Sequence, residues 1–491
     1  MTAAAVVAAT VAVATASPKV EAAPRKAAAP APGKWTEISA GLGGVNESGT
    51  PTVWLSPSDV ATVIWLREPT GSHFTYEEAV VSPSGTVSSG PLSIFGSSTW
   101  DSLTSQPTLV SAGAKPLLVM EGVKGTVGPL STGCIVGATP GSPTWTVLTW
   151  SLSNNCANPI GGAAVTRTGE LAAAWAGGWA GPPNNSFGVL YRVGVAPTIP
   201  AKGADSHIPF ASGDAYKTSV AADSEPTANN DVYVAFAHEN SNPSSGDGYY
   251  VKDVTAGSAT KKAPDSGTNS ISHIGGFDNL AITNSLVHPG IFMSYCSNGP
   301  TCNLELWRVG APKAMAVPHS ANAYSVAISA GPGGRVWLAW YDEANNTVAT
   351  TRTNASDTAF GPVETFKTPC LEHGLVGISA GTYARLDVAM QCITPSVKIE
   401  NYVTQSLAGL SLSPSKVTIK NTTSNNVTFK VTDVGAPVKG AVVSVDGHSA
   451  VTGAAGTATI TFPKGTKTGA FGVTAKATNY FAAHAALAIK S

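Results

Sequence analysis

The chain has 491 residues, 12% of them charged, and a formal net charge of −1. This length predicts two or more folded units. The basic stripe that a nucleic-acid partner requires is missing, so nucleic-acid binding is excluded from the expected functions. Gly, Ser, Thr, Ala and Val dominate, and no helical 3.6-residue period follows residue 33, which predicts an all-β fold.

The N-terminal segment predicts export from the cell. Residues 1–16 are small and apolar and end in an A-x-A site, which is typical of a secretory signal peptide and too short for a bilayer span. No Lys or Arg precedes this run, which leaves open a true start further upstream. A Pro/Ala-rich linker follows at 17–33, and no later segment is expected to cross a membrane.

One cassette recurs seven times between Pro51 and Cys392: a short strand, a turn, and an apolar strand ending in an aromatic residue or Met. Residues 324–341 and 374–391 align without a gap, at an offset of fifty. This periodicity predicts a seven-bladed β-propeller over 34–407, or six blades if the weak second cassette is not one. Residues 34–40 resemble a lone outer strand, which we expect to complete the last blade and close the ring.

From residue 408 to 491 alternating strands are separated by Gly-rich turns, which predicts a small β-sandwich. The segments 437–445, 456–460 and 475–480 resemble the immunoglobulin-like modules of bacterial secreted and surface proteins. This resemblance implies a spacer or adhesive module without catalytic residues.

Six cysteines all fall in the expected propeller. Chain order and strand geometry favour local pairs among the fifteen possible pairings. Disulfides suit an oxidising compartment, and the spacing does not indicate zinc. The predicted pairs are Cys134–Cys156, Cys296–Cys302 and Cys370–Cys392.

Polar residues follow the apolar strands and are expected on the top face of the propeller, around the central channel. Either they bind a ligand there or they only solvate turns. The candidate ligand-binding residues are Arg67, Glu121, His238, Glu239, Asp342 and Glu343. Those that could serve a glycoside hydrolase are Arg67, Glu68, Glu239 and Asp342.

Two segments, Gly96–Trp100 and Gly141–Trp145, resemble the Asp-box of sialidase-like propellers. The box aspartate is absent and the Trp lies one residue too far from the Gly. No arginine triad can be assigned. The resemblance therefore implies the propeller fold and gives no support to sialidase activity.

Two further patterns match known motifs in part. Residues 377–381 match the nucleophile motif G-x-S-x-G, with Glu372 and His373 close by. The repeat at 324–341 has a serine at the equivalent position, Ser329, and a strand is expected after both serines. The motif requires a helix there, which argues against a hydrolase. The loop with Glu239, Asn242 and Asp247 could hold Ca²⁺, although a simple loop is favoured and no cofactor is predicted.

The sequence as a whole predicts a secreted protein that recognises carbohydrate or a cell-surface polymer through the top face, and it leaves retention at the cell surface open. A sialidase-like glycoside hydrolase and a non-catalytic structural or adhesive protein are the alternatives. The ligand and the oligomeric state are not predicted.

Overall fold

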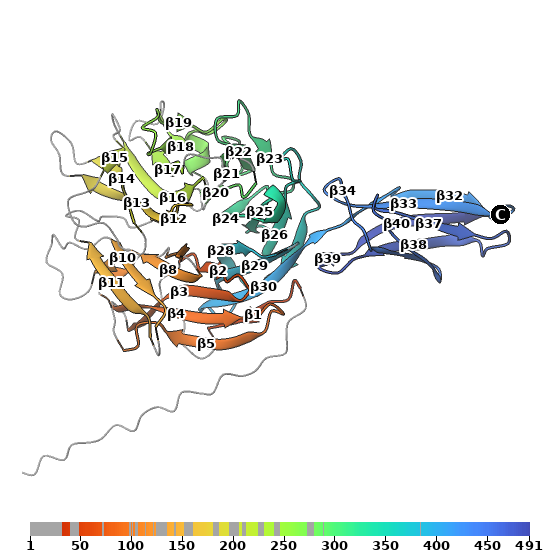
Figure 1. Ribbon diagram of the computed structural model, residues 1–491, viewed down its shortest axis with the longest axis horizontal. Coiled ribbons are helices and arrows are strands. Elements are labelled where there is room, and N and C mark those ends of the chain that lie inside the picture. The colour runs from red at the N-terminus through yellow and green to blue at the C-terminus, as the bar shows by residue number, and fades with distance from the viewer. Residues whose placement is uncertain are drawn as a thin grey trace, which may run out of the picture.

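The computed structural model is nearly all β-structure (Figure 1). Its one α-helix within the described ranges is the five-residue α1 (Thr268–Ser272), which the sequence did not predict. None of the helices in those ranges is long and apolar enough to cross a bilayer. The described residues are 32–39, 49–70, 73–97, 100, 102–103, 107–112, 114–120, 122–123, 135–141, 144–151, 161–179, 186–195, 206–208, 213–223, 230–239, 246–272, 279–287, 289–382 and 384–491.

Seven sheets, each with four antiparallel strands, make up the larger part of the chain, and one of them gains a fifth strand that pairs in parallel. The innermost strands contact one another in sequence, and the last also contacts the first, so the sheets close into a ring (Figure 1). The innermost strands are β2 (Thr52–Leu55), β7 (Thr108–Ala112), β12 (Gly162–Val165), β16 (Asp214–Ala222), β20 (Ala281–Asn284), β24 (Ala323–Ala330) and β28 (Glu372–Ala380). The second strands are β3 (Ala61–Thr70), β8 (Lys115–Met120), β13 (Glu170–Trp179), β17 (Val232–Glu239), β21 (Ile291–Cys296), β25 (Val336–Asp342) and β29 (Arg385–Ile393).

Third and outermost strands complete the sheets. The short pair β6 (Ser102–Leu103) and β9 (Gly122–Val123) lies apart from the seven sheets. The third strands are β4 (His73–Val81), β10 (Ile135–Thr139), β14 (Ser186–Val195), β18 (Gly248–Asp253), β22 (Leu304–Arg308), β26 (Thr347–Arg352) and β30 (Ile399–Gly409). The outermost strands are β5 (Val87–Ser93), β11 (Thr146–Ser151), β15 (Ser206–Ile208), β19 (Lys261–Lys262), β23 (Met315–Ala316), β27 (Glu364–Lys367) and β1 (Thr36–Glu37).

The strand β1 closes the ring from the N-terminal side, as the sequence predicts. Thr36 lies opposite Val403 and Glu37 opposite Tyr402 in β30, so the first strand of the chain completes the last sheet. A sheet edge that would otherwise offer unpaired backbone groups is thereby covered.

The second strands are apolar because neighbouring sheets cover both their faces. Every residue of β21 is buried, and Trp340 at the end of β25 is 0% exposed. Full burial of one such side chain stabilises the fold by roughly 1.5–3 kcal/mol. The continuous apolar runs of the sequence therefore reflect sheet-on-sheet packing.

Hydroxyl groups join successive innermost strands. Thr283 Oγ1 accepts a hydrogen bond from the backbone N–H of Ala330 at 3.2 Å, and Ser329 Oγ accepts one from Ala380 at 3.0 Å. Ser379, the serine of the G-x-S-x-G match, lies in β28 and is followed by β29. Ser379 therefore has the strand–turn–strand context that the sequence predicts, and not the strand–turn–helix context of a nucleophile elbow.

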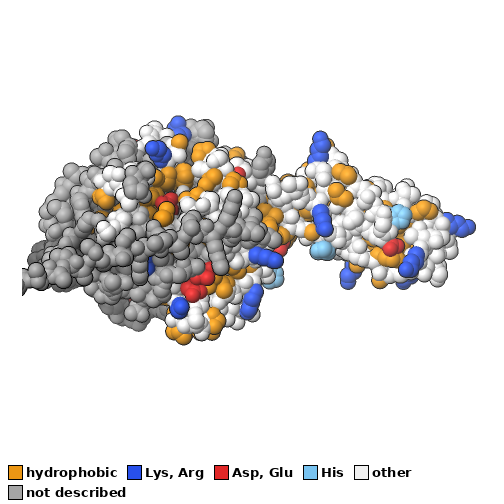
Figure 2. All heavy atoms as spheres, turned by 90° about the horizontal axis from the view of Figure 1, so that it is seen from below, with side chains coloured by type: hydrophobic (Ala, Val, Ile, Leu, Met, Phe, Trp, Pro, Cys, Tyr) orange, Lys and Arg blue, Asp and Glu red, His pale blue; other side chains and the backbone are white. Residues whose placement is uncertain are grey.

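Residues 411–490 form an arm of two sheets that projects from one side of the ring (Figure 1). Its core centres on Phe429, Val443, Val473 and Leu487. Basic, acidic and apolar side chains are interspersed on the face of the arm seen in Figure 2. Its strands are β31 (Ser411–Ser413), β32 (Lys416–Lys420), β33 (Asn425–Asp433), β34 (Ala436–Pro437), β35 (Val442–Val445), β36 (His448–Val451), β37 (Thr457–Phe462), β38 (Gly469–Lys476), β39 (Tyr480–Phe481) and β40 (Ala483–Lys490).

The arm is joined to the ring by more than the covalent chain. The strand β30 runs to Gly409, past the boundary expected at residue 407, and its end pairs in parallel with β39 of the arm. Phe366 of the ring also packs on Phe481, with ring centroids 5.8 Å apart. Because β30 and β39 pair across the junction, backbone hydrogen bonds connect the arm to the ring.

Candidate functional site

The residues that the sequence places on the top face come from different sheets. We define the top face as the side on which the innermost strands begin and the second strands end. Arg67 lies near the end of β3 and donates to the buried carboxylate of Glu77 on the adjacent strand. His238, at the end of β17, is 6% exposed, and its Nδ1 lies 2.9 Å from the carbonyl oxygen of Gly246. Arg67 therefore bonds to the adjacent strand of its own sheet, and His238 bonds to the loop that leads into β18.

Asp342 also acts locally. Its carboxylate accepts hydrogen bonds from the backbone N–H of Asn345 at 3.2 Å and from that residue's Nδ2 at 2.7 Å, which shapes the turn after β25. Glu239 is exposed at the end of β17. The side chain of Glu68 and the predicted positions Glu121, Asn242, Cys134 and Cys156 lie outside the described residues.

A cluster forms on the top face between the sixth and seventh sheets, and one of its members, Glu343, is a predicted ligand-binding residue. Glu343 Oε1 lies 3.6 Å from His373 Nδ1, and Glu372 Oε2 lies 3.9 Å from His373 Nε2. The ring of Tyr324 packs on the imidazole with centroids 5.2 Å apart. We call Tyr324, Glu343, Glu372 and His373 the mouth cluster.

The members of the mouth cluster are reachable from solvent. The side chains of His373, Glu343 and Glu372 are 40%, 29% and 48% exposed, and Tyr324 is half-buried. Both carboxylate–imidazole distances are longer than a hydrogen bond, so the side chains lie close together without a hydrogen bond between the carboxylates and the imidazole. The cluster combines an aromatic face with hydrogen-bonding groups at an accessible position.

Backbone irregularities place two of these residues at the mouth. The pairing of β24 with β25 shifts between Ala323 and Ser325, and that of β28 with β29 shifts between Glu372 and Leu375. Each bulge releases a residue from the regular pairing at the start of an innermost strand. His373 takes a left-handed conformation, with φ +54°, which costs a residue with a Cβ atom some strain. Such bulges redirect side chains and are frequent beside binding sites.

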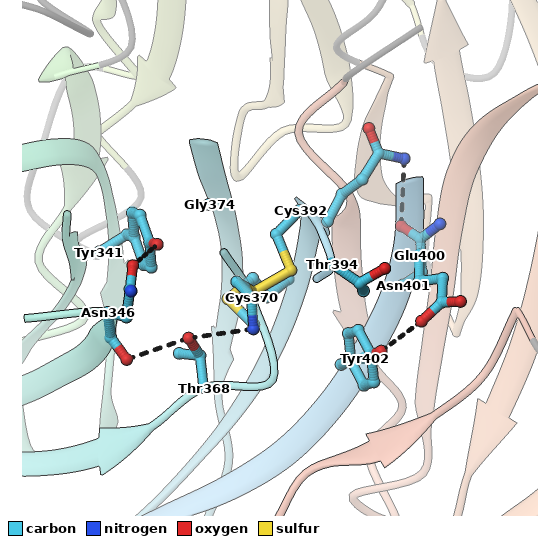
Figure 3. Close-up of a disulfide and its surroundings, with 12 residues drawn as sticks. Tyr341, Asn346, Thr368, Cys370, Gly374, Cys392, Thr394, Glu400, Asn401 and Tyr402 are labelled. Carbon is cyan, nitrogen blue, oxygen red and sulfur yellow. Dashed lines mark hydrogen bonds between the residues drawn. A yellow bond between two sulfur atoms is a disulfide. The ribbon is translucent and has the colours of Figure 1, made fainter. Parts of the chain in front are cut away.

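A network beneath the cluster holds the entry to β28 in place (Figure 3). Tyr341 donates its hydroxyl to Asn346 Oδ1 at 2.7 Å, and Thr368 donates its own to the carbonyl of Asn346 at 3.0 Å. Burial raises the pKa of Tyr341 well above its ordinary value, and the nearby carboxylates add to this shift, Glu343 most of all. The phenol therefore remains a hydrogen-bond donor at all physiological pH values.

Two disulfides of the structure are pairs that chain order predicts. Cys296–Cys302 closes the turn between β21 and β22, and Cys370–Cys392 ties the segment before β28 to the end of β29. Figure 3 shows the second disulfide, and its Cys370 lies two residues before Glu372 in the sequence. It therefore braces the segment that carries two members of the mouth cluster.

The innermost strands enclose an axial channel. One cavity of about 280 Å³ is lined by residues from all seven of these strands, Thr52 and Lys217 among them. A second cavity, of about 400 Å³, continues toward the opposite face and shares Ala163, Val220 and Ile282 with the first. Among the described residues, no group of three or more His, Cys, Asp and Glu side chains is placed to hold a metal ion.

No protein-family model matches the sequence, and no curated protein shows significant similarity to it. The chain is similar to a Penicillium chrysogenum alpha-L-arabinanase solved with arabinobiose: TM-score 0.40 and 12% identity over 66% of this chain and 98% of the other. It is also similar to the SapL1 lectin in complex with alpha methyl fucoside: TM-score 0.35 and 12% identity over 61% and 95% of the two chains. A leech intramolecular trans-sialidase gives a TM-score of 0.38 and 9% identity over 75% and 69%. At these scores and identities, the similarities carry no weight in the choice of function.

Sequence reasoning missed three members of the mouth cluster. The sequence marks Glu372 and His373 only as neighbours of the G-x-S-x-G match, and Tyr324 only as the first residue of a repeat. The one sequence signal was the alignment of the two repeats, which sets Tyr324 against Gly374 at the start of otherwise similar strands.

Proposed function

We propose that the protein is an exported recognition protein that binds carbohydrate or a cell-surface polymer through the mouth cluster. In this proposal the ring is a seven-bladed β-propeller and the arm is an immunoglobulin-like spacer. The seven four-stranded sheets support seven blades over six, and the two disulfides suit an oxidising compartment.

The observation that carries the proposal is the contact of Tyr324 with His373 between two carboxylates on an accessible face. An aromatic ring offers an apolar surface on which a sugar ring can stack. Carboxylates accept hydrogen bonds from hydroxyl groups, and charge assistance makes such bonds stronger than neutral ones. These two kinds of group together are what a polyhydroxylated ligand requires.

Glycoside hydrolysis remains the alternative, because Glu343 and Glu372 flank one imidazole and so lie within about 10 Å of each other, the range that glycosidase carboxylates span. The acid of such an enzyme needs a carboxyl shielded from water. Both side chains are instead partly exposed, at 29% and 48%. Recognition without cleavage therefore fits the site better.

The test is a glycan array probed with the full chain and with Tyr324→Ala. We expect binding to a subset of glycans, weakened at least about 10-fold by the loss of stacking and packing. Glu343→Gln tests the top face, and Glu170→Gln is its matched control, because Glu170 begins β13 on the opposite face. Only the first should weaken binding.

The same glycans are assayed for released sugar. Release that disappears in Glu343→Gln or Glu372→Gln, while Glu170→Gln remains active, would establish the hydrolase instead. No binding and no release across a broad panel would leave the structural or adhesive role.

A further inference from the structure

The mouth cluster carries negative charge that its described neighbours do not neutralise. Within the described ranges, neither the Glu343 nor the Glu372 carboxylate accepts a hydrogen bond, and each lies within ion-pair distance of His373 alone. His373 Nδ1 is itself buried and makes no hydrogen bond, so the imidazole does not occupy the acceptor atoms of Glu343. Lys367, at the end of β27, donates to the backbone carbonyl of Asn345 at 2.9 Å and pairs with neither carboxylate. Both carboxylates therefore keep acceptor atoms for a ligand.

The phenol beneath the cluster shows the sign of the local field. Tyr341 lies against the start of β28, since a Cβ atom at Gly374 would lie 2.6 Å from its ring. After burial, which is the largest cause, the charges of Glu343, Asp342 and Glu372 raise the pKa of this phenol, in that order of size. No lysine or arginine of the described residues opposes this rise. The top face between the sixth and seventh sheets is therefore a region of negative potential, which attracts cations.

Apolar surface lies beside these carboxylates. The ring of Tyr324 packs on the imidazole of His373 and meets the ring of Tyr341 edge-on, with centroids 5.2 Å and 6.4 Å apart respectively. Leu371, one residue before Glu372, is 47% exposed. Such surface can take the apolar face of a sugar ring, and the face of an aromatic ring also attracts a cation. The site thus combines a stacking surface with anionic groups at its edge.

We propose that the mouth cluster selects glycans that carry a protonated amine, such as those built of glucosamine without N-acetyl groups. In this arrangement the sugar ring lies against Tyr324, and its ammonium group donates to Glu343 or Glu372. Charge assistance makes these hydrogen bonds stronger than those that a sugar hydroxyl would donate to the same oxygen atoms. The inference names the ligand class of the mouth cluster, so it rests on the proposed glycan recognition.

The test is isothermal titration of the full chain at about pH 6.5, where an amine of the α-amino type is protonated. The probes are the β-linked tetramers of glucosamine, N-acetylglucosamine and glucose, which differ in the group at a single ring position. We expect the glucosamine tetramer to bind at least about 10-fold more tightly than either neutral tetramer, the effect of one charge-assisted hydrogen bond. Added salt should reduce this preference, because the carboxylates are partly exposed.

Variants connect the preference to the two carboxylates. Glu343→Gln and Glu372→Gln should each weaken binding of the glucosamine tetramer by about 3–10-fold, the upper range for a solvent-exposed charge pair, and weaken the neutral tetramers less. Tyr324→Ala should weaken all three tetramers, because the stacking surface serves each of them. Glu170→Gln, on the opposite face, is the matched control and should change none of the affinities. Circular dichroism establishes that each variant is folded.

The proposal is overturned if the glucosamine tetramer binds no more tightly than the neutral tetramers. It is also overturned if the folded double variant Glu343→Gln/Glu372→Gln retains the full preference; should the double variant not fold, the two single variants decide in the same way. Glycan recognition fails separately from the choice of an amine. Neutral tetramers that bind and respond to Tyr324→Ala would leave recognition standing, whereas an absence of binding to every tetramer and every glycan of the array would remove both.

A lysine side chain carries the same ammonium group as an amino sugar. A fourth titration, with a lysine tetrapeptide, therefore tests whether the ligand is a protein. Weaker binding of the tetrapeptide than of the glucosamine tetramer supports the proposal. Tighter binding of the tetrapeptide would identify a basic protein segment as the ligand and would overturn it.

Discussion

The guanidinium of Arg352, in the ring, donates to the carboxylate of Asp433, in the arm. Arg335 approaches the same carboxylate at 3.5 Å, and the hydroxyl of Tyr480 donates to it at 3.2 Å. The guanidinium of Arg352 also lies 5.2 Å from the ring centroid of Trp337. One buried acid of the arm is thus held by two cations of the ring.

Asp433→Asn should loosen the arm. The substitution removes the negative charge that faces two buried guanidinium groups, and breaking a buried ion pair of this kind costs about 3–5 kcal/mol. Burial already lowers the pKa of Arg335, and the charge of Asp433 opposes that shift. We expect faster proteolytic cleavage next to Gly409 and a larger radius of gyration by X-ray scattering. Asp446→Asn, at an exposed turn of the arm, is the control. Equal cleavage rates in the two variants would contradict the idea that Asp433 holds the arm to the ring.

The two disulfides should differ in their contribution to stability. Cys370–Cys392 spans 22 residues and Cys296–Cys302 spans 6. In the chain-entropy description the larger loop contributes about 3 kcal/mol and the smaller about 2 kcal/mol. Paired Cys→Ser variants should therefore show the greater loss of unfolding free energy for the first disulfide in urea titrations. The opposite order would mean that native-state strain outweighs loop entropy.

Gly374→Ala should disturb the mouth cluster from below. A Cβ atom at this position would lie 2.6 Å from the ring of Tyr341, which is fully buried and cannot move freely. Overpacking of this kind costs about 1–3 kcal/mol. We expect a loss of stability in urea and weaker glycan binding than wild type. Gly472→Ala is the matched control, because a Cβ atom there meets nothing within 4 Å.

The repeated segments predicted the inner strands of the ring closely. Ala327 lies opposite Ala339 in the sixth sheet, and Gly377 lies opposite Ala389 in the seventh, which preserves the fifty-residue offset of the sequence. A continuous apolar run indicates a strand that is buried on both faces, and a turn marks where the strand ends. Both signals lie within a short stretch of sequence, so they can be recognised without the structure.

The mouth cluster could not be predicted in the same way. A bulge arises from the pairing of two strands, so the residue that it releases is not marked in the sequence of either strand. The predicted residues Arg67, His238 and Asp342 are indeed polar residues near strand ends, but each bonds to the next strand or to the turn that follows its own strand. Polarity after an apolar strand predicts that these residues lie on the top face, but it does not predict which side chains lie together.

Glu78→Gln should change how stability depends on pH. Burial raises the pKa of Glu78 above its ordinary value of 4.5, and the hydrogen bond from Trp145 Nε1, at 3.0 Å, lowers it by less. In the pH range above 4.5 the folded protein therefore holds this proton more tightly than the unfolded chain does. The unfolding free energy consequently falls as the pH rises through that range. Glutamine carries no such proton and can still accept from Trp145, so the variant should gain stability relative to wild type between about pH 4 and about pH 7. Thermal melts of both proteins across this range measure the difference, and a gap in Tm that stays constant with pH would show that Glu78 does not titrate there.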